Sequence, residues 1–198
     1  MPKLRAETRS ERRKSLIDAA WRCAGVRGFS DLTVDDVCAA AGVSKGGFYG
    51  YFEQKQDLLL ALLDDDAIRL DAELDRISAA TSSGVDRLRR FAQAMLSRAD
   101  DPAPVQVRAD LWAALLTEPA VRERLAVVTG RRRERVRGWI DDAIASGELT
   151  EIPANAVASI LLALADGLIL HGALDPDGFR WRNIRRAIDQ MLAGIAAS

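Results

Sequence analysis

The sequence predicts an all-α protein of about nine helices, and three observations lead to this prediction. Apolar residues recur at intervals of three and four along almost the whole chain, whereas no segment shows the alternation of a half-exposed β-strand. Ser, Thr and Pro stand where these patterns begin, and Gly stands where several of them end. With 48% hydrophobic and 29% charged residues among 198, the chain is not disordered.

The first helices are marked by an apolar face and by caps. A stripe of apolar residues over 16–24 predicts the first helix. Thr33, followed three residues later by Asp36, has the spacing of a capping box and opens a short second helix. Gly42 suits a tight turn with positive φ, and Ser44 is placed to cap a third helix.

Caps and breaks also mark the later helices. Ser83 has an acid three residues on, as a cap requires, and Pro153 opens a later helix. Pro119 fits the first turn of a helix that Gly147 ends. The run 175–178 is a turn before the last helix. The third to ninth helices are therefore expected over residues 44–51, 54–79, from 83, around 111–116, over 119–146, from 153 and around 184–195.

The charge is unevenly distributed. The net charge is −1 and the calculated pI about 5.9, which excludes a histone-like protein. Residues 1–55 nevertheless hold ten basic and seven acidic side chains, whereas residues 56–198 hold 18 and 22. A basic head on an acidic body indicates a polyanion partner for the head alone. An Arg-rich, solvated helix face explains the charge equally well.

Other classes of site are excluded by composition. Two Cys and one His cannot supply the four ligands of a structural zinc site, and no metal or cofactor is expected. Cys23 and Cys38 form no CxxC pattern, which favours a reducing, cytoplasmic setting. The basic N-terminus is not followed by an apolar segment, so no signal peptide is expected. No Ser-His-Asp, HExxH or phosphate-loop pattern indicates an enzyme.

Two other segments have an ordinary explanation. Residues 156–174 are apolar enough for a membrane span, but Asp166, His171 and two Gly interrupt them. We therefore expect a helix buried in a core or a dimer interface. The five Arg between 131 and 137 are interpreted as a solvated helix face rather than a nucleic-acid patch.

The stretch 33–55 carries the functional signal. Two short helices around a Gly turn have helix-turn-helix geometry, in which the second helix enters the major groove of DNA. The apolar side chains of this stretch are spaced to pack against the first helix, and the polar and small ones to lie outside. The first set is Val37, Val43, Phe48 and Phe52, and the second is Ser44, Lys45, Gly46, Gly47 and Tyr49.

The same stretch has a capping Thr, an Ala-Gly-Val-Ser turn, a Lys-Gly pair, a Tyr-x-Tyr-Phe run and a following Lys. These are Thr33, Ala41-Gly42-Val43-Ser44, Lys45-Gly46, Tyr49-Gly50-Tyr51-Phe52 and Lys55. By this spaced signature, residues 10–60 closely resemble the TetR (tetracycline-repressor) family of bacterial regulators. The resemblance implies a helix-turn-helix domain over 1–55 and a ligand-binding and dimerisation domain over 56–198.

The resemblance also implies DNA contacts. Thr33 would donate its hydroxyl to a phosphate, Lys55 would grip a phosphate, and Tyr49 and Tyr51 would touch the DNA backbone or bases. Ser44, Lys45 and Gly46 match the leading edge of the recognition helix. On the alternative interpretation, Tyr51 only packs and Lys55 only caps a helix or lies in solvent.

Glycine is unusually frequent in this helix. Gly50 stands where the family often has a larger side chain, and Gly46 and Gly47 are also bare. We expect specificity to depend on Lys45, Tyr49 and DNA shape, and DNA to help order the helix. The N-terminal arm, with Arg5, Arg9, Arg12 and Arg13, is either a source of phosphate contacts or a solvated tail.

For the second domain, the resemblance implies an effector cavity among the fourth to seventh helices and a homodimer through the last two. Candidate ligand residues are Phe91, Met95, Asp110, Trp112 and Trp139. The expected function is a repressor that binds a palindromic operator as a dimer and is released by a partly apolar small molecule. The alternatives are a helical small-molecule-binding protein or enzyme without operator specificity, and a nonspecific DNA-packaging protein.

Overall fold

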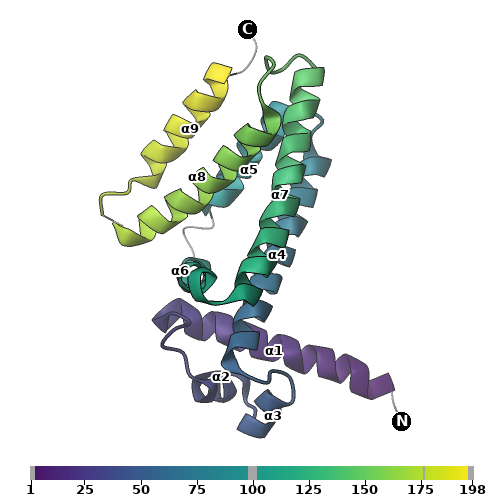
Figure 1. Cartoon of the computed structure of the whole chain (residues 1–198), viewed down its shortest axis with the longest axis vertical. Coiled ribbons are helices and arrows are strands. Elements are labelled where there is room, and N and C mark those ends of the chain that lie inside the picture. The colour runs from purple at the N-terminus through teal and green to yellow at the C-terminus, as the bar shows by residue number, and fades with distance from the viewer. Residues whose placement is uncertain (1–2, 98–101, 176, 196–198) are drawn as a thin grey trace. The chain divides into compact units, whose positions relative to one another are not determined.

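The computed structural model describes residues 3–97, 102–175 and 177–195, and these ranges contain nine α-helices (Figure 1). The all-α fold and the number of helices that the sequence predicts are thereby confirmed. The helices are α1 (Lys3–Arg27), α2 (Val34–Ala41), α3 (Lys45–Tyr49), α4 (Lys55–Ala80), α5 (Gly84–Ser97), α6 (Pro102–Thr117), α7 (Pro119–Ala145), α8 (Ala154–Leu174) and α9 (Trp181–Ile195).

The helix ends follow the caps that the sequence predicts. The Thr33 hydroxyl accepts from the Asp36 amide, and the Asp36 carboxylate accepts from the Thr33 amide, so the capping box is formed. Ser44 accepts from the Gly47 amide at the start of α3. Gly42 has a φ of 67°, in the left-handed region that favours glycine, which lets the chain turn sharply after α2.

α3 ends at Tyr49, two residues before the predicted end. The Tyr51 amide donates to the Phe48 carbonyl, only three residues back, over 2.9 Å. The same carbonyl also accepts from the Phe52 amide over 3.1 Å, so the backbone is tightened here before the chain leaves towards α4. α3 therefore has five residues, two of them glycine.

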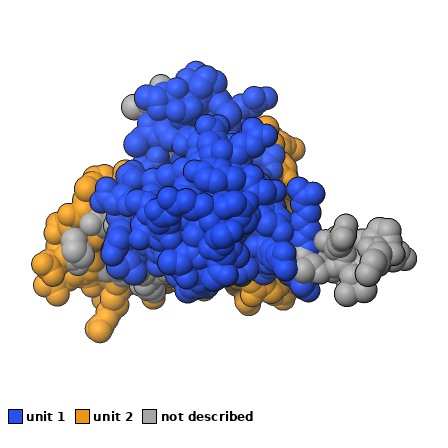
Figure 2. All heavy atoms as spheres, turned by 90° about the horizontal axis from the view of Figure 1, so that it is seen from below, with its two compact units in different colours: residues 1–67, 101–124 blue, residues 68–100, 125–198 orange. Residues whose placement is uncertain are grey.

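One compact unit consists of residues 1–67 and 101–124, shown in blue in Figure 2. In it α1 packs against both α2 and α6. α6 thus belongs to the same unit as the helix-turn-helix, although it lies within the ligand-binding domain that the sequence predicts. The fully buried side chains of this unit include Leu16, Leu32, Phe48, Leu58 and Leu62.

Three successive aspartates fix α4 within this unit. Asp64 pairs with Arg124 on α7, and Asp65 accepts from the Trp21 indole N–H on α1 over 2.8 Å. Asp66, buried to 7% exposure, lies 3.6 Å from Arg108 on α6. Consecutive helical residues point about 100° apart, so three neighbours in sequence reach three different helices.

The second unit consists of residues 68–100 and 125–198, shown in orange in Figure 2. Its core joins α4, α5, α7 and α8, and α9 packs against α5. The Phe91 and Trp139 rings meet edge to face with centroids 6.2 Å apart. The large side chains of the core cluster include Leu74, Leu88, Phe91, Met95, Trp139, Ile140 and Leu162.

The start of α5 lies very close to α7. A Cβ at Gly84 would lie 2.6 Å from the Ala143 Cβ and would also meet the Trp139 carbonyl oxygen. Only glycine allows the two helices to approach this closely. The carboxylate of Glu148, just beyond α7, accepts from the Ser83 hydroxyl and the Val85 amide, and these bonds hold its pKa below the usual range.

The arginine-rich face of α7 lies against acidic residues. Arg131 is 3.9 Å from Asp71, and Arg135 pairs with Asp75, both on α4. Arg137 pairs with Glu134 and Asp141 on its own helix. These arginines are partly exposed but neutralised by neighbouring carboxylates, which fits a solvated helix face.

α8 is long and apolar enough, over Ala154–Gly172, to cross a membrane by length and composition. Only 17% of that window is buried in the single chain, so the sequence-based expectation of a buried helix does not hold within one protomer. Ile160 is 63% exposed and Leu174 is 72% exposed. The helix presents apolar side chains at the surface of its unit.

Candidate nucleic-acid interface and ligand cavity

The helix-turn-helix is built on a buried aromatic anchor. Phe48 is fully buried, and its ring lies 5.4 Å from the rings of both Tyr49 and Phe52. Val37 is buried beside them, whereas Val43 is half-buried. The anchor fixes one side of the five-residue α3, and the opposite side faces outwards.

The outward side carries the residues that the sequence selects. Ser44, Lys45, Gly46 and Tyr49 are exposed, Tyr49 to 53%. The Lys45 ammonium lies 2.9 Å from the Asp35 carboxylate of α2, and this pairing raises the pKa of Lys45. A duplex that approached this surface would meet a lysine already oriented by an acid of the neighbouring helix.

Thr33 occupies the exposed N-terminus of α2, but its hydroxyl is already engaged. It donates to Asp36 over 2.6 Å and accepts from the Asp36 amide. The bond from Thr33 holds the pKa of Asp36 below its usual range, and Arg27 lies 3.6 Å from the same carboxylate. Donation from Thr33 to a phosphate therefore requires the hydroxyl to turn away from Asp36.

Arginines of α1 reach the aromatic residues beside α3. Arg9 lies over the Tyr51 ring at 5.8 Å, and Arg13 lies over the Phe52 ring at 5.2 Å. Tyr51 is half-buried, so it both packs and retains an exposed edge. Arg12 is exposed, and the Arg5 side chain lies outside the described residues. α1 is helical through this arm, which brings Arg9 and Arg13 onto the motif.

Lys55, at the start of α4, is held by the loop between α1 and α2. Its ammonium donates to the Ser30 carbonyl over 2.8 Å and lies 4.9 Å from the centre of the Phe29 ring. Burial lowers the pKa of Lys55, while Asp110 and Asp31 oppose that change. Lys55 does cap a neighbouring carbonyl, as the alternative interpretation expects, yet an ammonium has two further donors.

The candidate ligand residues fall into two groups. Phe91, Met95 and Trp139 are buried in the core of the second unit, and the Trp139 indole donates to the Ser78 hydroxyl. Phe91 and Met95 also line a narrow apolar crevice of about 30 Å³ between α5, α8 and α9. Trp112 belongs to the first unit and is 52% exposed.

Asp110 belongs to the first unit as well, and its carboxylate is occupied. One oxygen accepts from the Phe29 amide over 2.7 Å, and the other accepts from the Ser30 hydroxyl. Asp110, which the sequence predicted as a ligand contact, therefore accepts hydrogen bonds from the loop that holds Lys55. The sequence signal was only its position beside Trp112, which carries no information on so distant a partner.

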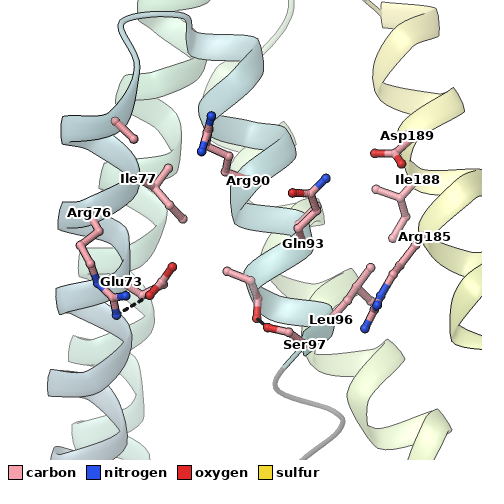
Figure 3. Close-up of a pocket in the computed structure, with 13 residues that line it drawn as sticks. Glu73, Arg76, Ile77, Arg90, Gln93, Leu96, Ser97, Arg185, Ile188 and Asp189 are labelled. Carbon is pink, nitrogen blue, oxygen red and sulfur yellow. Dashed lines mark hydrogen bonds and ion pairs between the residues drawn. The ribbon is translucent and has the colours of Figure 1, made fainter.

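A larger cavity lies where the sequence named no residue. A groove of about 630 Å³ opens between α4, α5 and α9, and charged side chains line it from three helices (Figure 3). Arg76 pairs with Glu73 on α4, and Arg90 and Gln93 come from α5. The remaining charged side chains, Arg185 and Asp189, come from α9. The charged and amide-bearing lining residues are Glu73, Arg76, Arg90, Gln93, Arg185 and Asp189.

These observations define a class of protein: a helix-turn-helix DNA-binding protein with a second, helical, cavity-bearing unit. The comparisons with known proteins give the family. Residues 16–62 match the model of the bacterial regulatory proteins of the tetR family, and residues 84–197 match the C-terminal domain of BetI-type transcriptional repressors. The chain belongs to the TetR family of transcriptional regulators, with a BetI-type C-terminal domain. It is a DNA-binding regulator and not an enzyme.

Individual relatives agree with this assignment. The chain is 35% identical over 179 residues to the transcriptional regulator BetI of Rhizobium meliloti, covering 88% of this chain and 83% of that protein. A TetR regulator from Haloarcula marismortui has the same fold, with a TM-score of 0.85 at 20% identity over 94% of this chain and 99% of that one. A transcriptional regulator from Saccharomonospora viridis, solved in complex with choline, has a TM-score of 0.83 at 21% identity, covering 96% and 99%.

Proposed function

We propose that the protein is a ligand-responsive repressor that binds a palindromic operator as a homodimer in the bacterial cytoplasm and leaves it when a small molecule binds. The exposed face of α3 carries this proposal. Ser44, Lys45, Gly46 and Tyr49 are exposed beside the buried Phe48, so this surface is accessible to a major groove. Thr33, Tyr51 and Lys55 flank it as phosphate contacts.

The dimer is proposed to form through α8 and α9. Ile160, Leu164 and Leu174 of α8 and Met191 of α9 are exposed apolar side chains in the single chain. A symmetric copy would cover them in a four-helix arrangement. Two α3 helices about 34–36 Å apart would then fit successive major grooves on one face of a duplex.

The effector is proposed to bind in the groove between α4, α5 and α9 and to extend into the apolar crevice. The two cavities share the lining residues Ala92, Leu96 and Ile188, so they adjoin each other. The groove offers charged groups of both signs, and the crevice offers Phe91 and Met95. This combination favours a small, partly apolar molecule that carries a charged group, and choline is a first probe because the Saccharomonospora viridis regulator binds it.

Release would follow from a difference in affinity between two states. A ligand that binds one arrangement of the second unit more tightly shifts the population towards that arrangement. Operator affinity falls if the distance between the two α3 helices then no longer matches successive major grooves. The ligand need not touch DNA. Phe91 and Met95 are the proposed apolar wall, Trp139 packs behind Phe91, and Trp112 is a more remote candidate.

The test is selection of bound duplexes from a random pool, followed by binding titrations of the selected duplex and of random DNA over a salt series. We expect a palindromic consensus, at least about 1,000-fold preference over random DNA, and one dimer per site. Equal affinity for all duplexes would favour a packaging protein. Absence of binding at low salt would overturn the proposal.

A further inference from the structure

We propose that Asp110 of α6 is a positioning residue of the DNA-binding surface: it fixes the Phe29–Ser30 loop, and this loop in turn orients the ammonium of Lys55 towards a DNA phosphate. The inference rests on the proposed operator contact of Lys55. It assigns to Asp110 a role in DNA binding instead of effector binding.

The first link is between α6 and the loop. The two Asp110 oxygens accept from the Phe29 amide, over 2.7 Å, and from the Ser30 hydroxyl. Two bonds from one carboxylate to consecutive residues fix both the position and the direction of that backbone segment. Hydrogen bonds to a charged acceptor are shorter and stronger than neutral ones, so the carboxylate holds this loop firmly.

The second link is between the loop and Lys55. The Ser30 carbonyl accepts from the Lys55 ammonium over 2.8 Å, and the Phe29 ring lies beneath the same ammonium at 4.9 Å. The two residues that Asp110 holds are therefore the two that orient Lys55. Lysine is a flexible side chain that loses rotamer freedom when it binds, and a loop that fixes it beforehand reduces that cost.

Electrostatics support the same chain of contacts. Burial lowers the pKa of Lys55, and the charge of Asp110 opposes this, with a further contribution from Asp31. One N–H of the ammonium is used on Ser30, and two remain for a phosphate. Asp110 thus opposes the effect of burial on the charge of Lys55 without a hydrogen bond to it.

The experiment is a double-mutant cycle on the full-length protein with its selected operator. The variants are Asp110→Asn, Lys55→Ala and the combination, with Ser30→Ala as a milder break that removes one of the two bonds. Asp75→Asn, which breaks an ion pair to Arg135 in the second unit, is the matched control. Thermal melts accompany each binding titration, so that loss of fold is recognised.

We expect Lys55→Ala to lower operator affinity ~10-fold and to reduce the salt slope by about one, as for a lost phosphate contact. Asp110→Asn should lower affinity ~5-fold, Ser30→Ala less, and Asp75→Asn not at all. The double variant should bind like Lys55→Ala within about twofold, because Asp110 acts through that lysine. Losses that multiply to about 50-fold, or an Asp110→Asn variant that binds normally, would overturn the inference.

The failures can be told apart. If Lys55→Ala changes neither affinity nor salt slope, the proposed contact of Lys55 is wrong, and the inference is overturned with it. If Lys55→Ala weakens binding but the Asp110 effect is independent, the operator proposal stands and only the positioning role is lost.

Discussion

The Lys45 ammonium lies 2.9 Å from the Asp35 carboxylate, so the first residue of α3 forms an ion pair with an acid of α2. The pairing raises the pKa of Lys45 and so favours its charged form. It also places a negative charge beside the surface that we propose to face DNA, and this charge would repel the phosphates.

We therefore predict that Asp35→Asn strengthens binding to every duplex, by roughly threefold to tenfold at low salt, because a like charge near the phosphates is removed. Lys45→Ala should weaken binding instead. Fluorescence anisotropy with operator and random duplexes over a salt series measures both. Unchanged binding by Asp35→Asn would show that Lys45 leaves Asp35 at no cost or takes no part in DNA binding.

The glycines of α3 predict a helix that is weakly stable alone. Gly46 and Gly47 have negative φ, and a Cβ at either would make only ordinary contacts, the nearest being 3.5 Å from Ser44 Oγ. We expect Gly47→Ala to stabilise α3 by about 0.5–1 kcal/mol. Hydrogen exchange of the α3 amides should slow in this variant, and should slow in the wild type when operator is added. Equal protection of α3 with and without DNA would contradict the second expectation.

Gly84→Ala should destabilise the second unit by about 1–3 kcal/mol, because its Cβ would collide with Ala143 and with the backbone at Trp139. The matched control is Gly138→Ala in α7, where a Cβ meets nothing within 4 Å. That substitution should be neutral or stabilising by up to about 1 kcal/mol, as for alanine in a helix. Urea unfolding of both variants provides the comparison, and equal loss in the two would refute the close-packing argument.

The Glu148 carboxylate predicts a loss of stability in acid. Its bonds to Ser83, Val85 and Ser146 lower its pKa in the folded state below that of the unfolded chain. The stabilisation is present above the unfolded pKa of about 4.5 and disappears as the pH falls through the lower, folded value. Urea midpoints measured from pH 7 to pH 3 should fall less steeply for Glu148→Gln, which starts from a lower stability at neutral pH. Parallel curves for the two proteins would argue against this role.

The exposed face of α8 predicts the dimer. Ile160→Asp should give a monomer in sedimentation experiments, with a normal melting profile of the single chain, because this side chain is 63% exposed within one protomer. Operator affinity should fall by at least about 100-fold at nanomolar concentration, since one half-site is lost. Ile68→Asp is the control, because Ile68 on α4 is equally exposed, at 67%, but lies outside α8 and α9. A dimeric Ile160→Asp protein would place the interface elsewhere.

Local signals in the sequence predicted the fold well. The capping box at Thr33, the Ser44 cap and the turn at Gly42 each involve residues only a few positions apart. Their structure can therefore be predicted from the local sequence. The end of α3 differs from the prediction because the Tyr51 and Phe52 amides share the Phe48 carbonyl, and no side chain in the sequence indicates this tightening.

Contacts between distant residues were beyond sequence reasoning. Asp110 stands 80 residues from Ser30, and the sequence shows an acid beside Trp112 without showing where its oxygens point. In the groove between α4, α5 and α9, the residues of α9 likewise lie more than 80 positions beyond those of α4 and α5, and its arginines have the pattern of ordinary surface residues in each helix. Only the packing of the helices brings them together.

The three aspartates Asp64, Asp65 and Asp66 limit how α4 can move. Because each is bound to a different helix, a rotation of α4 about its own axis would break all three attachments at once. A tilt or a small slide, in contrast, carries the attached helices along with it. We therefore expect a signal that passes along α4 to move the whole attached group rather than to rotate α4 about its own axis.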